Sequence, residues 1–365
     1  MTCPAKFPGV SGSDAYEAGR MSQGHNHMTA VPLRRSFPGR YLGTVVRDAA
    51  RMALALLTCR LARMSSSRRG LAIVYHRVGG DGGDPDLEIL PAVSSGVFER
   101  QLRHLRRHYR VVPAEELLEA TRRRRRGRRF PVAITFDDDL ESHVREAVPA
   151  LRRAGLTATF FLGGAALHEP HSFWWEDLQR AIDGRLVTPD DIPQVPEAEV
   201  RAALERSPRA ILDLAGVIVR LEPPKKTEVA AELRAAAGSP AADSGLRAPD
   251  VRTIVDAGCT VGFHTLRHDA LTSLSDPELE EALSEGRESL AAAAGRDPKL
   301  IAYPHGKADG RVADAARKAS FALGFTTARG PVAADTDPFL IPRTVADQSV
   351  GDLALRLARA VAPRR

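Results

Sequence analysis

Short apolar segments alternate with amphipathic helical segments along most of this chain, and this alternation constrains the fold more than any other feature. The apolar segments have the length of buried strands and cover 71–75, 131–136, 157–162, 259–263 and 300–303. Helical patterns lie between them, at 95–109, 115–125 and 142–154. Repeated strand, loop and helix predict an α/β fold with parallel strands, in which functional residues collect on loops at the carboxyl ends of the strands.

The alternation does not cover the whole chain, so the sequence predicts further segments. Residues 1–40 are rich in Gly, Ser, Pro and His without periodicity, and we expect a disordered leader there. Residues 41–70 read as a basic amphipathic helical segment, and 71–350 as the catalytic domain. Pro-rich turns and Ala/Glu/Arg-rich helices over about 184–249 indicate a helical insertion in that domain. Residues 351–365 are expected to form a C-terminal helix or tail.

Positive charge is concentrated in two segments. The formal net charge is +6, yet the first 70 residues alone hold eleven basic and three acidic side chains. Seven further arginines lie within 122–129. No aromatic residues alternate with these arginines as stacking platforms, and blocks of like charge are usually solvated. We therefore expect no nucleic-acid partner.

The segment 41–63 places apolar residues at helical spacing among arginines. Such a helix suits peripheral contact with an anionic membrane surface. The alternative is a helix packed on the edge of the main domain with its arginines in water. The short apolar stretch at 52–58 and the lack of interfacial tryptophan favour this second interpretation.

Cysteine content and hydropathy bear on the compartment. Cys3, Cys59 and Cys259 are odd in number and far apart, which argues against a disulfide framework and favours a reducing environment. The sequence contains no apolar run long enough to span a bilayer, and residues 1–20 lack the pattern of a secretory signal. We expect a cytoplasmic location, with membrane association through 41–63 as the open alternative.

Chemically unusual residues follow three of the predicted strands. Three consecutive aspartates, 137–139, end one strand, His264 and His268 follow another, and Tyr303 begins the sequence Tyr-Pro-His-Gly. Adjacent carboxylates at the end of an apolar strand repel one another, so they need a cation or water nearby. Two histidines four residues apart lie on one face of a turn and can both reach one metal ion.

A second histidine pair has the same spacing. His104 and His108 lie in a helical stretch that is rich in arginine and has no carboxylate in reach along the helix. Because positive neighbours disfavour a cation, we interpret this pair as solvated and on the surface. Context, and not spacing, separates the two pairs.

Asp138, His264 and His268 together would supply two nitrogens and one oxygen and leave a fourth position for water, as in catalytic zinc-type sites. A divalent ion lowers the pKa of its water and polarises a carbonyl oxygen, and amide or ester hydrolysis needs both effects. The neighbouring Asp137 is the candidate base for the proton of that water. The expected cofactor is a divalent metal, zinc in the first place and cobalt or nickel as alternatives.

The order of these motifs resembles the polysaccharide deacetylase family, also described as the NodB-homology or carbohydrate esterase family 4 group. The resemblance covers about 71–344, through Thr-Phe-Asp-Asp at 135–138, Ala-Thr-Phe-Phe at 158–161, His-Thr-x-x-His at 264–268 and Tyr-Pro-x-Gly at 303–306. It implies a distorted (β/α) barrel, similar to a TIM barrel, and removal of an N-acetyl or O-acetyl group from a sugar. An acetylated carbohydrate would then be the substrate.

The resemblance also implies roles for individual residues. The base of the family matches Asp137, and its metal ligands match Asp138, His264 and His268. The turn that begins at Tyr303 matches the motif in which a backbone N–H stabilises the oxyanion. We place that donor at Tyr303 or at the next free N–H, since the proline that follows has none.

This chain departs from the family pattern in three ways. Asp139 replaces the usual glycine, and its charge is expected to raise the pKa of Asp137 or to hold a further histidine. The late histidine that commonly protonates the leaving group is missing. His76, in a Tyr-His segment that resembles circularly permuted deacetylases, is therefore the candidate acid, and His305 is the second choice. The arginine of the usual third motif is also missing, and Arg343 is the candidate substitute for orienting the base.

The sequence Phe-Trp-Trp at 173–175 contains both tryptophans of the chain. Aromatic faces stack well on sugar rings, but such residues can equally anchor the insertion that follows, and we favour anchoring.

Two further functions remain open beside deacetylation of a glycan. The same site could hydrolyse another C–N bond, such as that of a cyclic amide or ureide, and a small closed pocket would favour this reading. The chain could also be a degenerate carbohydrate-binding protein that has lost turnover. A wide cleft would favour the glycan.

Overall fold

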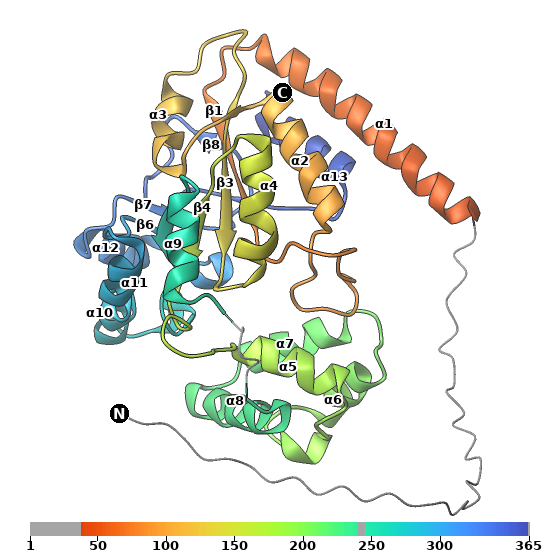
Figure 1. Ribbon diagram of the computed structural model, residues 1–365, viewed down its shortest axis with the longest axis vertical. Helices are drawn as coiled ribbons and strands as arrows, with labels where there is room; N and C mark the ends of the chain where they lie inside the picture. Colours follow the sequence, from red (N-terminus) through yellow and green to blue (C-terminus); the bar gives the residue numbers. More distant parts are fainter. Residues whose placement is uncertain (1–37, 240–244, 364–365) are drawn as a thin grey trace, which may run out of the picture. The chain divides into compact units, whose positions relative to one another are not determined.

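The computed structural model describes residues 38–239 and 245–363 (Figure 1). The chain divides into two units, Met1–Leu42 and Gly43–Arg365, and the architecture below belongs to the second. The predicted disordered leader, residues 1–40, lies almost wholly outside the described residues.

Nine strands form one sheet in the part of the chain that the structure describes. They are β1 (Arg69–Tyr75), β2 (Arg110–Val111), β3 (Pro131–Asp137), β4 (Thr159–Leu162), β5 (Thr260–Phe263), β6 (Leu300–Ala302), β7 (Leu323–Phe325), β8 (Val332–Ala333) and β9 (Thr344–Val345). All five predicted strands are present as β1, β3, β4, β5 and β6. Of the other four, β2, β8 and β9 contain two residues each, too few to show a hydrophobic period, and β7 contains three, as β6 does.

Helices cover most of the remaining described chain. They are α1 (Pro38–Arg63), α2 (Ser95–His108), α3 (Leu117–Arg122), α4 (Val148–Ala154), α5 (Trp174–Asp183), α6 (Glu197–Leu204), α7 (Ala210–Val219), α8 (Pro223–Ala237), α9 (Ala248–Asp256), α10 (Asp276–Ser284), α11 (Arg287–Ala294), α12 (Gly310–Lys318) and α13 (Val350–Val361). The predicted helix at 142–154 begins as a π-helical turn over His143–Ala147. It becomes α-helical only at α4, where Pro149 has no N–H to donate to an α-helical ladder.

The sheet closes into a distorted barrel, as predicted. Its strand order is β7-β6-β5-β4-β3-β1-β8, with parallel pairing throughout except between β1 and β8. β2 pairs with β3 in parallel. β9 pairs with β1 through Thr344 and Ile73, and Ile341 makes a parallel bridge with Phe325 of β7. The segment 341–345 therefore joins the two ends of the strand series.

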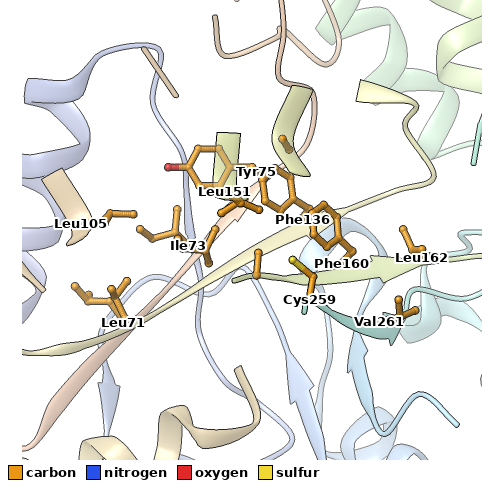
Figure 2. Packing of buried hydrophobic residues seen from close by; sticks show 14 of the residues in the cluster. Leu71, Ile73, Tyr75, Leu105, Phe136, Leu151, Phe160, Leu162, Cys259 and Val261 are labelled. Atoms are coloured by element: carbon orange, nitrogen blue, oxygen red, sulfur yellow. The ribbon is translucent and has the colours of Figure 1, made fainter. Parts of the chain in front are cut away.

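Successive strand residues point into two different hydrophobic cores. Ile73, Phe136 and Phe160 belong to the larger cluster, which Figure 2 shows from close by. The rings of Phe136 and Phe160 stack with centroids 4.6 Å apart. Ala72 and Ala133, on the other face, belong to a smaller cluster. Burial of both faces explains why the strands are continuous apolar runs in the sequence.

Helices α5 to α8 lie between β4 and β5 in the sequence, where the insertion was predicted, and are grouped together in Figure 1. They share a hydrophobic cluster of their own, which includes Leu178, Leu214 and Leu233. This helical segment begins at Trp174, earlier than the predicted start near 184, because α5 packs into the same cluster.

Helix α1 packs on the barrel domain by one face. Ala55 and Cys59 are buried there. Asp48 accepts hydrogen bonds from the Ser349 hydroxyl and the Gly351 N–H, at the start of α13. In the described parts of the chain, no helix has the length and apolar character needed to cross a membrane.

Candidate active site

The strand register brings the polar strand ends to one edge of the barrel. His76 directly follows β1, and Asp137 ends the neighbouring parallel strand β3. β4 lies between β3 and β5, and its Leu162 is in register with Phe263, the residue before His264. The carboxyl ends of these strands therefore meet, as expected for parallel strands.

Asp138, His264 and His268 form the one group of three potential metal ligands found within residues 38–239 and 245–363. Oδ1 of Asp138 lies 3.6 Å from Nε2 of His264 and 3.5 Å from Nε2 of His268. Ligand bonds of about 2.0–2.1 Å in a tetrahedral site imply ligand separations of about 3.4 Å. The observed separations fit a divalent metal better than they fit hydrogen bonds.

The protonation states of these side chains also suit a metal. Nδ1 of His264 lies 2.7 Å from the Ala302 carbonyl, so it carries the proton and leaves the Nε2 lone pair facing Asp138. Burial lowers the pKa of both His264 and His268, which favours the neutral form that metal ligation requires. Burial, reinforced by the two adjacent aspartates, raises the pKa of Asp138 well above its ordinary value. Its Oδ1 is buried and has no hydrogen-bond partner among the described residues, and a cation would supply the missing charge.

Asp137 is held by Arg343, which lies in the barrel-closing segment. Nη1 and Nη2 of Arg343 donate to the two carboxylate oxygens of Asp137, at 2.6 and 2.7 Å. Its other nitrogen contacts are the Thr326 carbonyl and the Thr135 hydroxyl. Burial alone would raise the pKa of Asp137, but Arg343 and His264 outweigh it and lower this pKa to about 2. Arg343 thus occupies the orienting position that the sequence suggested for it.

Left-handed backbone conformations gather around the same residues. Asp138, Thr265, His268 and His305 have φ values of 72°, 60°, 53° and 57°. For a non-glycine residue this conformation costs on the order of 1 kcal/mol, so the surrounding contacts have to maintain it. Two of the four residues are candidate metal ligands. Backbone strain of this kind is typical of functional sites.

His143 belongs to the site, although the sequence analysis did not identify it. Its Nε2 lies 3.0 Å from the carbonyl oxygens of both Asp137 and Asp138. Its ring packs against Phe136 and Phe160, with centroids 5.2 and 5.3 Å away. The histidine therefore holds the backbone that carries the candidate base and one ligand. A histidine shortly after the aspartates was the only signal available in the sequence.

Asp139 has neither of the two roles expected for it. Its carboxylate accepts hydrogen bonds from the N–H groups of Gly163 and Ala165, at 3.0 and 2.9 Å. Burial raises its own pKa to about 6 in spite of these bonds. The pKa of Asp137 is lowered, not raised. Asp139 anchors the loop after β4.

Tyr303 does not offer a donor to the site. Its N–H donates to the Phe325 carbonyl at 3.0 Å as part of the sheet, and its hydroxyl donates to the Phe339 carbonyl at 2.9 Å. The placement of the oxyanion donor at Tyr303 itself is therefore corrected. The next residue of the turn that has an N–H is His305, because Pro304 has none.

Both histidines considered as the acid lie beside the candidate centre. The ring of His305 is 4.8 Å from that of His268. Burial lowers the pKa of His305 to about 4. Burial also lowers the pKa of His76 to about 4, against the effect of Asp137, which raises it. Of these two histidines, His76 is the one whose pKa the candidate base, Asp137, raises.

The two tryptophans have different surroundings. Trp174 packs against the cluster of helices α5 to α8, as expected of an anchor. Trp175 stacks on Phe173 with centroids 4.4 Å apart, and its ring lies 4.5 Å from that of His268. Its buried Nε1 has no hydrogen-bond partner in the described residues. Only Trp175 therefore lies at the candidate site.

A cavity of about 700 Å³ lies next to Trp175, Asp139 and Arg77, and its wall includes none of Asp137, Asp138, His264 and His268. Charged side chains of both signs line it, and Arg77 pairs with Glu176 at 3.1 Å. Because charged side chains in the wall pair with one another, the cavity suits a polar ligand that has no large net charge.

The second histidine pair is separate from this centre. The rings of His104 and His108 lie 4.8 Å apart on α2. The expectation of a solvated pair is wrong for His104, which is only 9% exposed and packs toward Tyr109. Burial lowers its pKa to about 4.

Comparison with known proteins identifies the family. A family model described as polysaccharide deacetylase matches residues 124–324, more than half of the chain. The chain belongs to the polysaccharide deacetylase family. No curated protein matches the sequence of this family member.

Solved structures show the same fold for this polysaccharide deacetylase family member. The deacetylase PplD of Streptococcus pyogenes, in complex with acetate, aligns with a TM-score of 0.53 at 15% identity, covering 81% of this chain and 99% of that one. IcaB from Ammonifex degensii aligns with a TM-score of 0.51 at 19% identity, covering 81% and 97%. The polysaccharide deacetylase BC0361 from Bacillus cereus aligns with a TM-score of 0.50 at 16% identity, covering 81% and 69%.

Proposed function

We propose that this protein is a metal-dependent hydrolase that removes acetyl groups from N-acetylated sugars or polysaccharide. The observation that carries the proposal is the position of an ionised Asp137 beside the buried group of Asp138, His264 and His268. Oδ2 of Asp137 lies 3.9 Å from Nε2 of His264. Two imidazole nitrogens and one carboxylate oxygen favour zinc as the metal, with cobalt or nickel as alternatives.

A divalent ion held by Asp138, His264 and His268 would supply a water of lowered pKa and a Lewis acid for the acyl carbonyl. Asp137 would accept the proton of that water. Because Arg343 lowers the pKa of Asp137 to about 2, this carboxylate is a weak base and needs an acidic proton donor. The same ion pair keeps the carboxylate ionised and correctly oriented.

The leaving amine needs a proton, and we propose His76 as its donor, with His305 as the alternative. The Asp137 carboxylate opposes the lowering of the His76 pKa by burial, and this proximity to the candidate base favours His76 over His305. The N–H of His305 is the proposed oxyanion donor, since the donors of Tyr303 are engaged elsewhere. One such donor contributes on the order of 3 kcal/mol in acyl-transfer enzymes.

The cavity bears on the choice of substrate. A volume of about 700 Å³ beside Trp175 and Asp139 would hold further units of a glycan whose acetylated sugar lies at the candidate metal ligands, and a small cyclic amide would not need this space. The presence of the base together with a full set of candidate ligands argues against a carbohydrate-binding protein without turnover.

The direct test is acetate release from a panel of N-acetylated and O-acetylated sugars and glycans by the purified protein. We expect activity on at least one of them, loss of that activity with a chelator, and recovery with zinc or cobalt. Activity that a chelator leaves unchanged, with no metal in the protein, would contradict the proposal.

A further inference from the structure

Helix α1 presents two apolar faces, and only one of them is covered by the barrel domain. On the covered face, Ala55 and Cys59 are 1% and 3% exposed. On the opposite face, Leu57 and Leu61 are 56% and 66% exposed. Residues four apart lie one above the other on a helix, so these two leucines belong to one row.

Exposed large apolar side chains are concentrated on this row. Seven such side chains are exposed in the described residues, and five of them lie on α1 or directly after it: Val46, Leu54, Leu57, Leu61 and Met64. The other two, Leu186 and Val345, are far away in the sequence. A single exposed leucine needs no explanation, but a continuous row indicates a contact surface.

Exposed arginines border the row, and a further arginine of α1, Arg51, pairs with Asp352 at 2.8 Å. Helical spacing places Arg60 on one side of the row and Arg47 on the other, and both are exposed. Asp48 is the one acidic residue between 46 and 64. It lies on the covered face, where it accepts hydrogen bonds at the start of α13.

The C-terminal end of α1 leads into a cluster of arginines. Arg63 donates to the carbonyl of His108 at the end of α2, and its own carbonyl accepts the Gly127 N–H at 2.8 Å. The arginine-rich loop 122–129 therefore packs against the end of the helix. Burial lowers the pKa of His108 most, and four nearby arginines lower it further: Arg63, Arg107, Arg129 and Arg60. Three of them, Arg60, Arg107 and Arg129, are exposed.

We propose that the apolar row of α1 and the adjoining arginine cluster bind the surface of an anionic lipid bilayer. The leucines would enter the boundary between headgroups and acyl chains, and the arginines would meet lipid phosphates. Because the other face of α1 is packed on the domain, the helix lies along the bilayer surface. This inference is independent of the proposed reaction.

Other occupants fit the row less well. A second copy of the chain, packed row to row, would bring the bordering arginines of both copies close to one another, and like charges repel. A nucleic acid would meet the arginines and leave the leucines in water. An anionic bilayer matches both features at once.

Vesicle cosedimentation tests the proposal with the full chain. We expect binding to vesicles of equal parts phosphatidylglycerol and phosphatidylcholine, weaker binding to phosphatidylcholine alone, and at least a tenfold lower partition coefficient for L57E/L61E. L186E is the matched control, because Leu186 is 50% exposed and lies in the insertion. Thermal unfolding checks that both variants are folded. No binding by the wild type, or equal binding by L57E/L61E and L186E, would overturn the proposal.

A site-specific probe separates insertion of the row from adsorption through other basic segments. In a Cys3→Ser background, Leu61→Cys carries an environment-sensitive fluorophore, and Leu186→Cys carries it in the control. Cys59 and Cys259 are buried. We expect a blue shift at position 61 on anionic vesicles and none at position 186. A protein that is bound to vesicles without a shift at 61 would refute the proposed orientation.

Two further measurements address the other occupants. Light scattering without lipid gives the mass in solution, and a dimer that L57E/L61E converts to monomer would assign the row to a second copy. Filter binding measures the affinity for duplex and single-stranded nucleic acid. If nucleic acid displaces the protein from vesicles, and L57E/L61E binds nucleic acid as tightly as the wild type, the arginine cluster would be assigned to nucleic acid. We expect neither result.

Discussion

Arg343 and Asp137 form a buried, bidentate ion pair across 206 residues of sequence, with nitrogen to oxygen distances of 2.6 and 2.7 Å. The two side chains are 0% and 4% exposed. Arg343 lies in the segment that joins the two ends of the strand series, and Asp137 ends a central strand. The orientation of the candidate base therefore depends on closure of the barrel.

Removal of this arginine should destabilise the fold strongly. R343M leaves the Asp137 carboxylate buried without its partner, which costs about 3–5 kcal/mol in comparable cases. Urea unfolding measures the loss. The double variant D137N/R343M removes both charges and should recover a large part of it. An R343M protein as stable as the wild type would show that the pair does not form.

Metal content should separate the base from the ligands. We expect D137N to retain bound metal and lose turnover, and H264A to lose metal by at least an order of magnitude in affinity, since one of three ligands is gone. Elemental analysis of the purified variants measures both. H104A/H108A is the control for histidine removal, because that pair lies outside the candidate centre. Metal loss in this control, with retention in H264A, would reverse our assignment.

His143 should affect the site without touching a substrate. H143F keeps an aromatic ring between Phe136 and Phe160 but removes the hydrogen bonds to the two aspartate carbonyls. Loss of supporting partners of this kind lowers metal affinity or activity by about 10–100-fold. We expect a fall in kcat and in metal affinity with little change in KM. Unchanged metal affinity and kcat in a folded variant would mean that backbone packing alone holds the site.

The two tryptophans provide a matched test of the cavity. W175F shrinks the aromatic surface beside His268, so we expect a higher KM for an acetylated glycan and a smaller effect on kcat. W174F, within the helical cluster, should leave KM unchanged and lower the unfolding temperature slightly. Steady-state kinetics of both variants decide the point. Equal KM values in W174F and W175F would remove Trp175 from the binding surface.

His104 predicts a pH dependence of stability away from the site. Its pKa is lowered by burial from 6.5 to about 4, so the folded state favours the neutral ring. The contribution of neutral His104 to the free energy of unfolding is fully present above pH 6.5. It is lost as the pH falls toward 4, and the loss is at most about 3 kcal/mol. Urea unfolding at several pH values should show a smaller decline for H104L than for the wild type. Parallel curves would show that His104 does not contribute.

Local pattern was sufficient for much of this fold. The strands β1, β3, β4, β5 and β6 are visible in the sequence because each lies in a continuous apolar run between polar loops. The ligands Asp138, His264 and His268 are visible because they directly follow such runs and keep a spacing that suits a metal. These features depend on neighbouring residues, which a sequence displays directly.

Features that depend on contacts across the barrel were not visible in the same way. Arg343 could be named as a candidate partner of Asp137, but nothing in its local sequence shows that it points into the barrel. The Asp139 carboxylate accepts hydrogen bonds from the Gly163 and Ala165 N–H groups, and the Tyr303 N–H donates within the sheet. Both arrangements follow from strand pairing. His143 reaches the aspartate carbonyls from the first residue of a π-helical turn.

The sequence by itself therefore determined the fold class, the family and the residues able to hold a metal. The tertiary structure decided which groups orient them, which donors are already engaged and which face of α1 remains exposed. The physical reason is that a short motif specifies the chemistry of a side chain. Its hydrogen-bond partners and its burial are set by barrel closure and strand register, which bring together residues from distant parts of the chain.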